Sequence, residues 1–227
     1  MTDVGSPSGF VPDPELPSVK MNLLTPKQPA VVPVVANELC VSAKSSSFVR
    51  HFTVDVSGTP LEGNFRVGQA FGILPPGLDE DDKAHKVRLY SICSPSLGED
   101  GAGKIFATPV KRLIDEHWDD HSLFLGVASN YLCNLRPGDE VAITGPSGRR
   151  FLLPDTTDDH DYLFISTGTG IAPFRGMLME LLERDTRANI TLISGSAYAT
   201  DLLYDCLLYT SDAADDTPSL DLGGRSI

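Results

Sequence analysis

A glycine-rich loop that joins an apolar segment to a helix is the first stretch whose residue types could bind a charged ligand. The apolar residues 162–167 run into Gly168, Thr169 and Gly170, and Pro173 opens the helical segment. Glycine lets the backbone approach an anion, threonine adds a hydroxyl donor, and the first helical position needs no backbone N–H. The loop therefore suits a pyrophosphate, although a tight turn without a ligand is the alternative. It is neither a P-loop, because no Gly-Lys-Ser/Thr follows, nor a Gly-x-Gly-x-x-Gly loop, because Pro173 takes the last glycine's place.

Two further stretches carry groups that could hold a flat, phosphorylated molecule. In the segment 88–91, Arg88 offers a guanidinium that can grip phosphate, and Tyr90 offers a ring that can stack on a flat ring system. In the segment 126–132, small residues enter a short helix whose first amides could hold another pyrophosphate. Each stretch has an ordinary alternative, which is a plain strand for the first and a helix end capped by Ser129 for the second.

Short β-type segments occupy residues 36–154, between glycine and proline punctuation. Roughly six such strands at this spacing predict a small antiparallel β-barrel. The turn residues agree, since Pro137 and Gly138 take the second and third positions of a type II turn just before a strand. Residues 1–35 mix Pro, Ser, Val and Lys without periodicity, which predicts an extended or disordered arm. The predicted strands lie in 51–56, 65–74, 86–92, 104–113, 139–144 and 150–154.

The pattern changes to alternating strand and helix in residues 155–205. A buried strand at 162–167, an amphipathic helix from Pro173 and a second strand at 189–195 predict a β-α-β unit. Ligands bind at the carboxyl ends of the strands in such units, where the glycine-rich loop and Gly195 lie. We therefore expect an antiparallel six-stranded β-barrel domain, followed by an incomplete Rossmann-like α/β nucleotide-binding domain.

The composition argues against several classes of protein. The net charge of -13 disfavours a nucleic-acid partner, because neutralising phosphates requires clustered Lys and Arg. No apolar run reaches the ~20 residues of a membrane span, and the N-terminal region resembles neither a signal peptide nor a transit peptide. We expect a cytoplasmic protein without a membrane span. The four cysteines form no Cys-x-x-Cys pair, which favours reduced structural thiols and no metal site.

Four stretches, taken in order, resemble the ferredoxin–NADP reductase family of plants and cyanobacteria. They are FRVGQAFGILPPG from residue 65, HKVRLYSICS from residue 85, GVASNYLCNLRPGDEVAITGPSGRRFLLP from residue 126 and STGTGIAPFRGML from residue 166. The resemblance covers residues 39–205, and four motifs in register are far more specific than any one of them. It implies an FAD-dependent oxidoreductase that passes electrons between NADP(H) and a one-electron carrier such as ferredoxin or flavodoxin. The reductase component of an oxygenase and a non-catalytic flavin-binding fragment are the alternatives.

The family's roles carry over to residues of this chain. The resemblance implies that Arg88 binds the FAD phosphates, that Tyr90 stacks on the flavin and that Ser91 lies near flavin N5, where hydride arrives. Ser91 and Tyr90 are therefore the catalytic candidates. Lys111 falls where the family often has a lysine near the nucleotide phosphates, and a solvated strand lysine is the alternative. The other cofactor-binding candidates are Leu89, Gly126, Val127, Ala128 and Ser129 for FAD, and Gly168, Thr169, Gly170, Ile171, Ala172 and Pro173 for NADP(H).

Three features depart from the family's pattern. Asp115 stands where plant members often place a tyrosine against the adenine, and Ala128 replaces the usual cysteine of the second FAD loop. Neither change removes the phosphate or flavin contacts. The acidic composition contrasts with the basic surface that reductases generally offer to an acidic ferredoxin, so the identity of the carrier stays open.

Residues 206–227 do not continue the family's sequence. They resemble the in-frame translation of a sequencing-library adapter, which predicts a truncated chain with a non-native tail, and a divergent disordered tail is the alternative. The residues that would select NADPH over NADH would then be missing. We expect the chain as it stands to bind FAD weakly at best and to lack NADPH-dependent activity, because two strands and one helix make a marginal domain.

Overall fold

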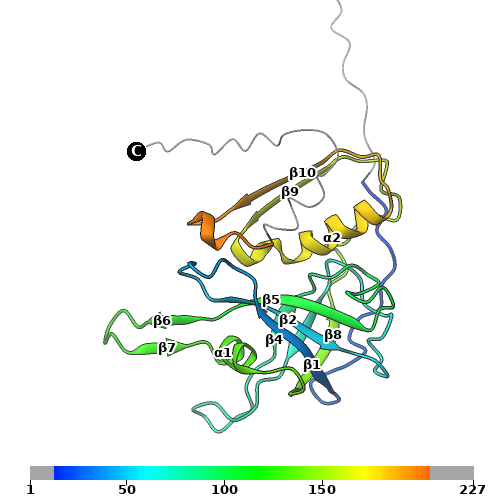
Figure 1. Cartoon of the computed structure of the whole chain (residues 1–227). Coiled ribbons are helices and arrows are strands. Elements are labelled where there is room, and N and C mark those ends of the chain that lie inside the picture. The colour runs from blue at the N-terminus through cyan, green and yellow to red at the C-terminus, as the bar shows by residue number, and fades with distance from the viewer. Residues whose placement is uncertain (1–12, 205–227) are drawn as a thin grey trace, which may run out of the picture.

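The computed structural model describes residues 13–204, which form two packed units (Figure 1). The first unit contains a six-stranded sheet, a hairpin and a short helix, and the second contains a two-stranded sheet and a longer helix. The strands are β1 Ala30–Leu39, β2 Val49–Asp55, β3 Ala70–Ile73, β4 Arg88–Ser91, β5 Ile105–Lys111, β6 Ile114–Glu116, β7 Leu123–Leu125, β8 Glu140–Ser147, β9 Tyr162–Thr167 and β10 Ile190–Gly195. The helices are α1 Val127–Asn134 and α2 Ala172–Glu183, with 3-10 turns η1 Gly168–Ile171 and η2 Ala199–Asp201. None of the helices in residues 13–204 is long and apolar enough to cross a bilayer.

The six-stranded sheet has the order β4-β3-β8-β1-β2-β5, and every neighbouring pair is antiparallel. Two hydrogen bonds link its ends, from Cys93 N to Ala107 O at 2.9 Å and from Thr108 Oγ1 to Ser91 O at 2.8 Å. However, β4 and β5 form no paired ladder, and β4 has only four residues. A sheet of six antiparallel strands is therefore confirmed, with five of them in predicted segments. The closed barrel is not shown, because the sheet stays open between β4 and β5.

Strand β1 corrects the predicted limit of the N-terminal arm. The sequence places residues 30–35 in the arm, but they belong to a strand in the middle of the sheet. Val32 and Val34 point into the core and are 1% and 2% exposed. The proline at position 33 conceals this strand in the sequence. It is tolerated because residues 30–33 pair on one side only, with β8, and pairing with β2 begins at Val34.

The strand predicted at residues 150–154 does not form. This apolar run instead crosses from the first unit to the second, and Leu152 and Leu153 are both buried. Leu153 packs with Val67 of the first unit and with Met177 of α2. The segment thus contributes apolar contacts between the two units rather than hydrogen bonds to the sheet.

The second unit confirms the predicted β-α-β arrangement. β9 and β10 pair in parallel, from Tyr162 opposite Ile190 to Thr167 opposite Gly195. Helix α2 lies between this small sheet and the six-stranded sheet (Figure 1). The other face of the small sheet exposes Leu163, which is 61% exposed, together with Ile165 and Ile193. Apolar residues on both faces are typical of parallel strands that are covered on both sides, and within residues 13–204 only α2 supplies a cover.

Helix α2 approaches the first unit closely through Gly176. A Cβ atom at this position would lie 2.5 Å from the carbonyl oxygen of Ser94 and 2.8 Å from Val67 Cγ2. The same contact is reinforced by a hydrogen bond of 2.9 Å from Ser96 N to Glu180 Oε2. The absence of a side chain at position 176 therefore lets the helix backbone rest against the loop that follows β4.

Candidate functional site

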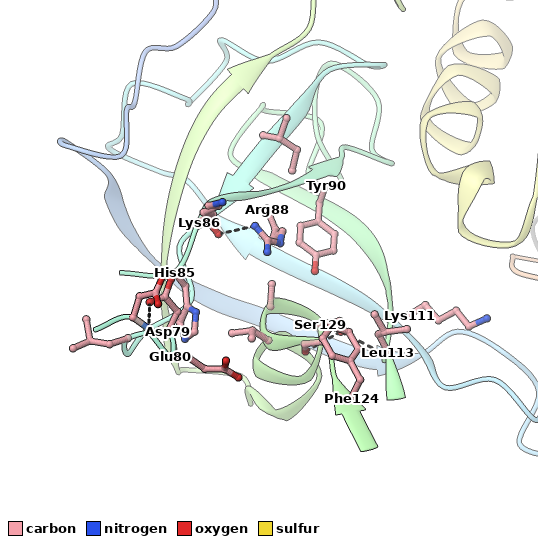
Figure 2. Close-up of a pocket in the computed structure, with 16 residues that line it drawn as sticks. Asp79, Glu80, His85, Lys86, Arg88, Tyr90, Lys111, Leu113, Phe124 and Ser129 are labelled. Atoms are coloured by element: carbon pink, nitrogen blue, oxygen red, sulfur yellow. Dashed lines mark hydrogen bonds between the residues drawn. The ribbon is translucent and has the colours of Figure 1, made fainter. Parts of the chain in front are cut away.

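A cavity of about 820 Å³ brings together most of the residues that the sequence assigns to flavin binding. Its walls come from the loop before β4, from β4 itself, from the end of β5, from the β6–β7 hairpin and from the start of α1 (Figure 2). The lining residues are Leu78, Asp79, Glu80, Asp81, His85, Lys86, Arg88, Leu89, Tyr90, Lys111, Leu113, Phe124, Gly126, Val127, Ala128 and Ser129.

Arg88 presents an available cation to this cavity. Strand β4 is an edge strand, and its first two residues are exposed. The guanidinium donates only long hydrogen bonds, to Lys86 O at 3.3 Å and Val87 O at 3.5 Å, and the described residues offer it no carboxylate partner. A bidentate anion such as a phosphate could therefore bind without first displacing an ion pair.

Tyr90 supplies a half-buried aromatic ring on the same strand. It packs against the core beside Phe71, with ring centroids 6.4 Å apart. Burial raises the pKa of the Tyr90 phenol to about 12, with a smaller contribution from Cys133. The phenol is therefore neutral at physiological pH, and the ring packs on the core while it lines the cavity, where it can stack on a flat ligand.

The N-terminus of α1 faces the same cavity and provides free backbone amides. Gly126 is the N-cap residue, and the first helical hydrogen bond runs from Asn130 N to Gly126 O at 3.0 Å. The amides of residues 127–129 precede this bond, so they have no partner in the helix. A Cβ atom on Gly126 would lie 2.7 Å from Ser129 Oγ and 2.8 Å from Leu113 Cβ, so the close approach requires glycine. A helix end with no acidic residue in its first turn suits a phosphate.

Ser129 does not cap the helix, contrary to the alternative considered from the sequence. Its hydroxyl accepts a hydrogen bond from Leu113 N at 3.1 Å and donates one to Gly126 O at 3.2 Å. Gly126 N in turn donates to Leu113 O at 3.0 Å. Ser129 therefore joins the start of α1 to the chain that leaves β5, which fixes the orientation of the amides toward the cavity.

A second cavity of about 610 Å³ lies at the carboxyl ends of β9 and β10. Gly168 has a φ of 50°, in the left-handed region, and opens the 3-10 turn that leads into α2. Lys111 lines this cavity as well as the first one, so it joins the two sites. The lining residues are Ser46, Ser47, Phe48, Val49, Lys111, Arg112, Ile114, Thr167, Gly168, Thr169, Ser196, Ala197, Tyr198, Asp201 and Leu203.

Several predicted residues lie outside both cavities. Ser91 is half-buried next to Tyr90, and its carbonyl accepts the bond from Thr108. Gly170 is exposed on η1. The side chains of Ile171, Ala172 and Pro173 are buried, and the first two pack in an apolar cluster with residues of both units, including Val49 and Tyr204. Their roles in nucleotide binding stay predictions, and packing is what the structure shows for them.

The structure also identifies residues that the sequence did not single out. Leu113 and Phe124 line the first cavity, and Arg112 and Ile114 line the second. The signal available was the alternation of residues 112–114, which sends neighbours to opposite sides. Arg112 donates to Asn130 Oδ1 at 3.2 Å and to Asn134 Oδ1 at 2.7 Å, so it ties α1 to the second cavity.

A polar cluster between the two units contains His51, Cys93, Glu99, Arg175 and Tyr204. Single ligand atoms of His51, Cys93 and Glu99 lie within 4.8 Å of one another, as in a metal site. However, both carboxylate oxygens of Glu99 are paired with Arg175, and burial raises the pKa of the Cys93 thiol to about 12. A thiol and a paired carboxylate are poor metal ligands, so the cluster is better described as an ion-pair network.

Comparisons with known proteins agree with this arrangement. The family described as Oxidoreductase NAD-binding domain matches residues 164–219. A ferredoxin–NADP reductase from Spirulina sp is 37% identical over 191 residues, which are 82% of this chain and 64% of the relative. The cyanelle ferredoxin–NADP reductase of Cyanophora paradoxa is 42% identical over 168 residues, which are 73% of this chain and 44% of that protein. The chain thus spans about half to just under two thirds of the length of these curated relatives.

A solved structure has the same fold. The ferredoxin–NADP+ reductase of Plasmodium falciparum matches with a TM-score of 0.70 and 26% identity, over 84% of this chain and 67% of that one. The NAD-binding family match extends into residues 206–219, and the segment 206–227, predicted to be non-native, lies outside the described residues. On the relatives and this structure together, the chain is similar to part of the ferredoxin–NADP reductases.

Proposed function

We propose that this chain forms part of an FAD-dependent oxidoreductase that passes electrons between NADP(H) and a one-electron carrier, ferredoxin or flavodoxin. The observation that carries the proposal is the first cavity, where a guanidinium, an aromatic ring and the first amides of a helix meet. Among residues 13–204 the guanidinium has no carboxylate partner. This donor set fits a molecule with a flat ring system and a pyrophosphate. The names of the relatives, which include ferredoxin–NADP reductases of plants and cyanobacteria, support the same assignment.

The residues of the first cavity would divide the work of holding FAD. Tyr90 would carry the flavin ring, Arg88 would pair with a phosphate, and the amides of residues 127–129 would bind the pyrophosphate. The tie between Ser129 and Leu113 N, at 3.1 Å, would keep those amides in place while the ligand binds. Because these contacts would come from β4 and α1 of the first unit, the site would be organised before the ligand arrives.

The second cavity would receive NADP(H). Gly168 and Thr169 line it at the end of β9, and Lys111 supplies a cation that both cavities share. FAD, when bound, supplies a group that accepts hydride and releases single electrons. The protein's part is to place the nicotinamide nucleotide beside the first cavity, and Lys111 would draw its phosphates toward the boundary between the two sites. The half-buried Ser91 would orient the reacting edge from the end of β4.

The experiment uses two proteins. One is the chain of 227 residues, and the other replaces everything after residue 205 by the corresponding segment of the Spirulina relative. Each is titrated with FAD while flavin fluorescence is followed, and is then mixed with NADPH and ferricyanide. We expect both proteins to bind one FAD, the chain of 227 residues more weakly, and we expect only the extended protein to reduce ferricyanide.

The outcomes separate the proposal from its competitors. Absence of FAD binding by both proteins would overturn it outright. If FAD binds to the extended protein but NADPH reduces nothing, the chain is a flavin-binding module and the proposed reaction is wrong. Replacing Lys111 by Ala in the extended protein should raise the KM for NADPH more than it changes kcat, since a phosphate contact remote from the reacting atoms contributes mainly to binding.

A further inference from the structure

Arg175 of α2 contacts the chain that leaves strand β4. Its Nη1 donates to the carbonyl oxygen of Cys93 at 3.0 Å, and Nη1 and Nη2 both donate to the carboxylate of Glu99. Cys93 lies two residues after Ser91, which ends β4. Arg175 is the fourth residue of α2, the helix that begins directly after the glycine-rich turn η1. One guanidinium therefore connects a strand of the first cavity to the helix that follows the loop of the second.

The groups that Arg175 binds are anchored within the first unit. Ser94 Oγ donates to Glu99 Oε1 at 2.6 Å and accepts a hydrogen bond of 2.8 Å from Ala107 N, in β5. Cys93 N donates to Ala107 O at 2.9 Å. The segment after β4 is thus held to β5 by backbone and side chain, so Arg175 fixes α2 against a firm support.

We propose that Arg175 is a positioning residue that sets the distance between the reacting atoms of the flavin and the nicotinamide. This inference rests on the proposed function, which puts the two ligands in different cavities. Hydride transfer, in which one proton moves with two electrons, needs donor and acceptor atoms about 3 to 3.5 Å apart, and a displacement of about 1 Å can slow such a step about 100-fold. Arg175 lines neither of these two cavities, so it would act without touching either ligand.

Other contacts between the two units lie away from this junction. Glu180, more than one turn further along α2, accepts a hydrogen bond of 2.9 Å from the loop after β4. Asp201 of η2 accepts hydrogen bonds from the hydroxyls of Ser45 and Ser47, which lie in the loop between β1 and β2. These contacts would keep the units together in an Arg175 variant, so we expect α2 to shift rather than to separate from the sheet unit.

The planar guanidinium is what makes this junction specific. Arg175 forms three hydrogen bonds with Cys93 and Glu99 from two nitrogens held in one plane. An ammonium group keeps the charge, and therefore leaves no buried carboxylate without a cation, but it cannot reproduce this fork. Arg175→Lys is for that reason the variant that changes position with the least loss of structure.

The first measurement is the rate of FAD reduction by NADPH, in the protein that carries the C-terminal segment of the Spirulina relative. We expect Arg175→Lys to slow the reduction at saturating NADPH by about 10-fold to 100-fold. FAD affinity and the KM for NADPH should hardly change, since the lost interaction serves the reaction and not the binding of either ligand. Glu180→Ala, which removes a contact between the units away from the end of β4, is the control and should keep a rate near that of wild type.

The second measurement needs neither cofactor nor turnover. The Cys93 thiol is fully buried at the junction, 3.6 Å from the hydroxyl of Tyr204. The chain of 227 residues is alkylated with iodoacetamide, and mass spectrometry of its peptides gives a labelling rate for each cysteine. We expect Arg175→Lys to label Cys93 about 10-fold faster, the factor that corresponds to losing one charge-assisted hydrogen bond. Cys133, in the core of the sheet unit, should keep its slow rate.

An unchanged reduction rate in Arg175→Lys, or an equal fall in Glu180→Ala, would overturn the inference and leave the proposed function intact. Labelling of Cys93 that is no faster in Arg175→Lys than in wild type would overturn it as well, because the guanidinium would then not hold the junction. A wild-type protein that binds FAD but is not reduced by NADPH would overturn the proposed function together with this inference.

Discussion

The guanidinium of Arg175 donates two hydrogen bonds to the carboxylate of Glu99 across the boundary between the two units. They join Nη1 to Oε1 at 2.6 Å and Nη2 to Oε2 at 3.2 Å. The side chains are only 10% and 22% exposed. Arg175 also donates to Cys93 O at 3.0 Å, and its charge lies 5.1 Å from the ring of Tyr204. One side chain of α2 therefore fixes the helix to the sheet unit that carries the first cavity.

Removing one partner of this pair should destabilise the protein more than removing both. Glu99→Gln leaves a buried guanidinium unpaired, and we expect a loss of roughly 3 kcal/mol in the free energy of unfolding. Adding Arg175→Met to Glu99→Gln should recover part of that loss. Urea unfolding measures both. Lys83→Met, in an exposed pair with Asp81 whose side chains are 73% and 75% exposed, is the control and should cost less than ~1 kcal/mol. A loss for Glu99→Gln no larger than the control's would contradict the structural role.

His51 should make the stability of the protein fall on the acidic side of neutral pH. Burial, and then the charge of Arg175, lowers the pKa of His51 below its ordinary value of 6.5. Glu99 and Glu38 act in the opposite direction, and the imidazole Nδ1 lies 3.0 Å from the hydroxyl of Tyr204. The unfolded chain therefore takes up the proton more readily than the folded chain does. This contribution to stability is complete above pH 6.5 and is lost as the pH falls through the lower, folded pKa.

Thermal unfolding from about pH 7.5 to about pH 5 tests this dependence, because the ordinary histidine pKa lies in that window. We expect His51→Gln to have a lower Tm than wild type at pH 7.5, and a smaller further fall in Tm at pH 5. His117→Gln, an exposed position in the hairpin, should follow the wild-type curve. Parallel curves for wild type and His51→Gln would show that another group is responsible.

Gly176→Ala should destabilise the protein, although alanine is normally the better residue inside a helix by about 1 kcal/mol. The added Cβ would lie 2.5 Å from the backbone oxygen of Ser94, and a backbone atom cannot move aside as a flexible side chain can. Overpacking of this kind typically costs ~1 to 3 kcal/mol. Gly170→Ala is the matched control, because a Cβ atom at position 170 would meet no atom within 4 Å. If Gly176→Ala is as stable as Gly170→Ala, the contact between α2 and the sheet unit is looser than described.

The sequence could predict that the motifs around Arg88 and Gly126 each form a local structure, because their signals are local. Arg88 and Tyr90 share one strand, and Gly126 and Ser129 share one turn of helix, so each pair is placed by a short motif. The structure then brings the two motifs to one cavity. The β-α-β unit could be predicted equally well, since its apolar strands and its helix are contiguous in the chain.

The features of the fold that the sequence could not predict depend on contacts between residues that are distant in the chain. β1 was missed because a proline at position 33 argues against a central strand. The sequence pattern does not show that residues 30–33 are paired on one side only, where a proline is tolerated. The cross-strand pairing of Asp115 with Phe124 joins residues nine positions apart, and the Glu99–Arg175 pair joins residues 76 positions apart. Closure of the barrel was the hardest point, because it requires a ladder between β4 and β5 that strand counts alone do not decide.

Arg88→Ala should weaken FAD binding without unfolding the protein. The guanidinium forms no short hydrogen bond within the described residues, so its loss leaves no buried group unpaired. Each charge-assisted bond to phosphate contributes ~1.5 to 3 kcal/mol, which corresponds to a loss of about 10-fold to 150-fold in affinity. FAD titrations measure the loss, and Arg88→Lys should restore part of it by keeping the charge. Undiminished affinity in Arg88→Ala would remove Arg88 from the FAD site.

Ser91→Ala should retain FAD and slow its reduction by NADPH. Ser91 ends β4 directly after Tyr90, and the bond from Thr108 Oγ1 to its carbonyl, at 2.8 Å, holds its backbone in place. A preorganised donor at the reacting atom lowers a barrier by ~2 to 4 kcal/mol, so we expect reduction to slow by about 30-fold to 1000-fold. Stopped-flow absorbance measures the rate, in the protein that carries the C-terminal segment of the Spirulina relative. Thr108→Val removes the hydrogen bond to the Ser91 carbonyl but leaves the Ser91 hydroxyl in place, so the reduction rate of this variant should fall less than that of Ser91→Ala. Equal rates for wild type and Ser91→Ala would leave Ser91 as an ordinary strand residue.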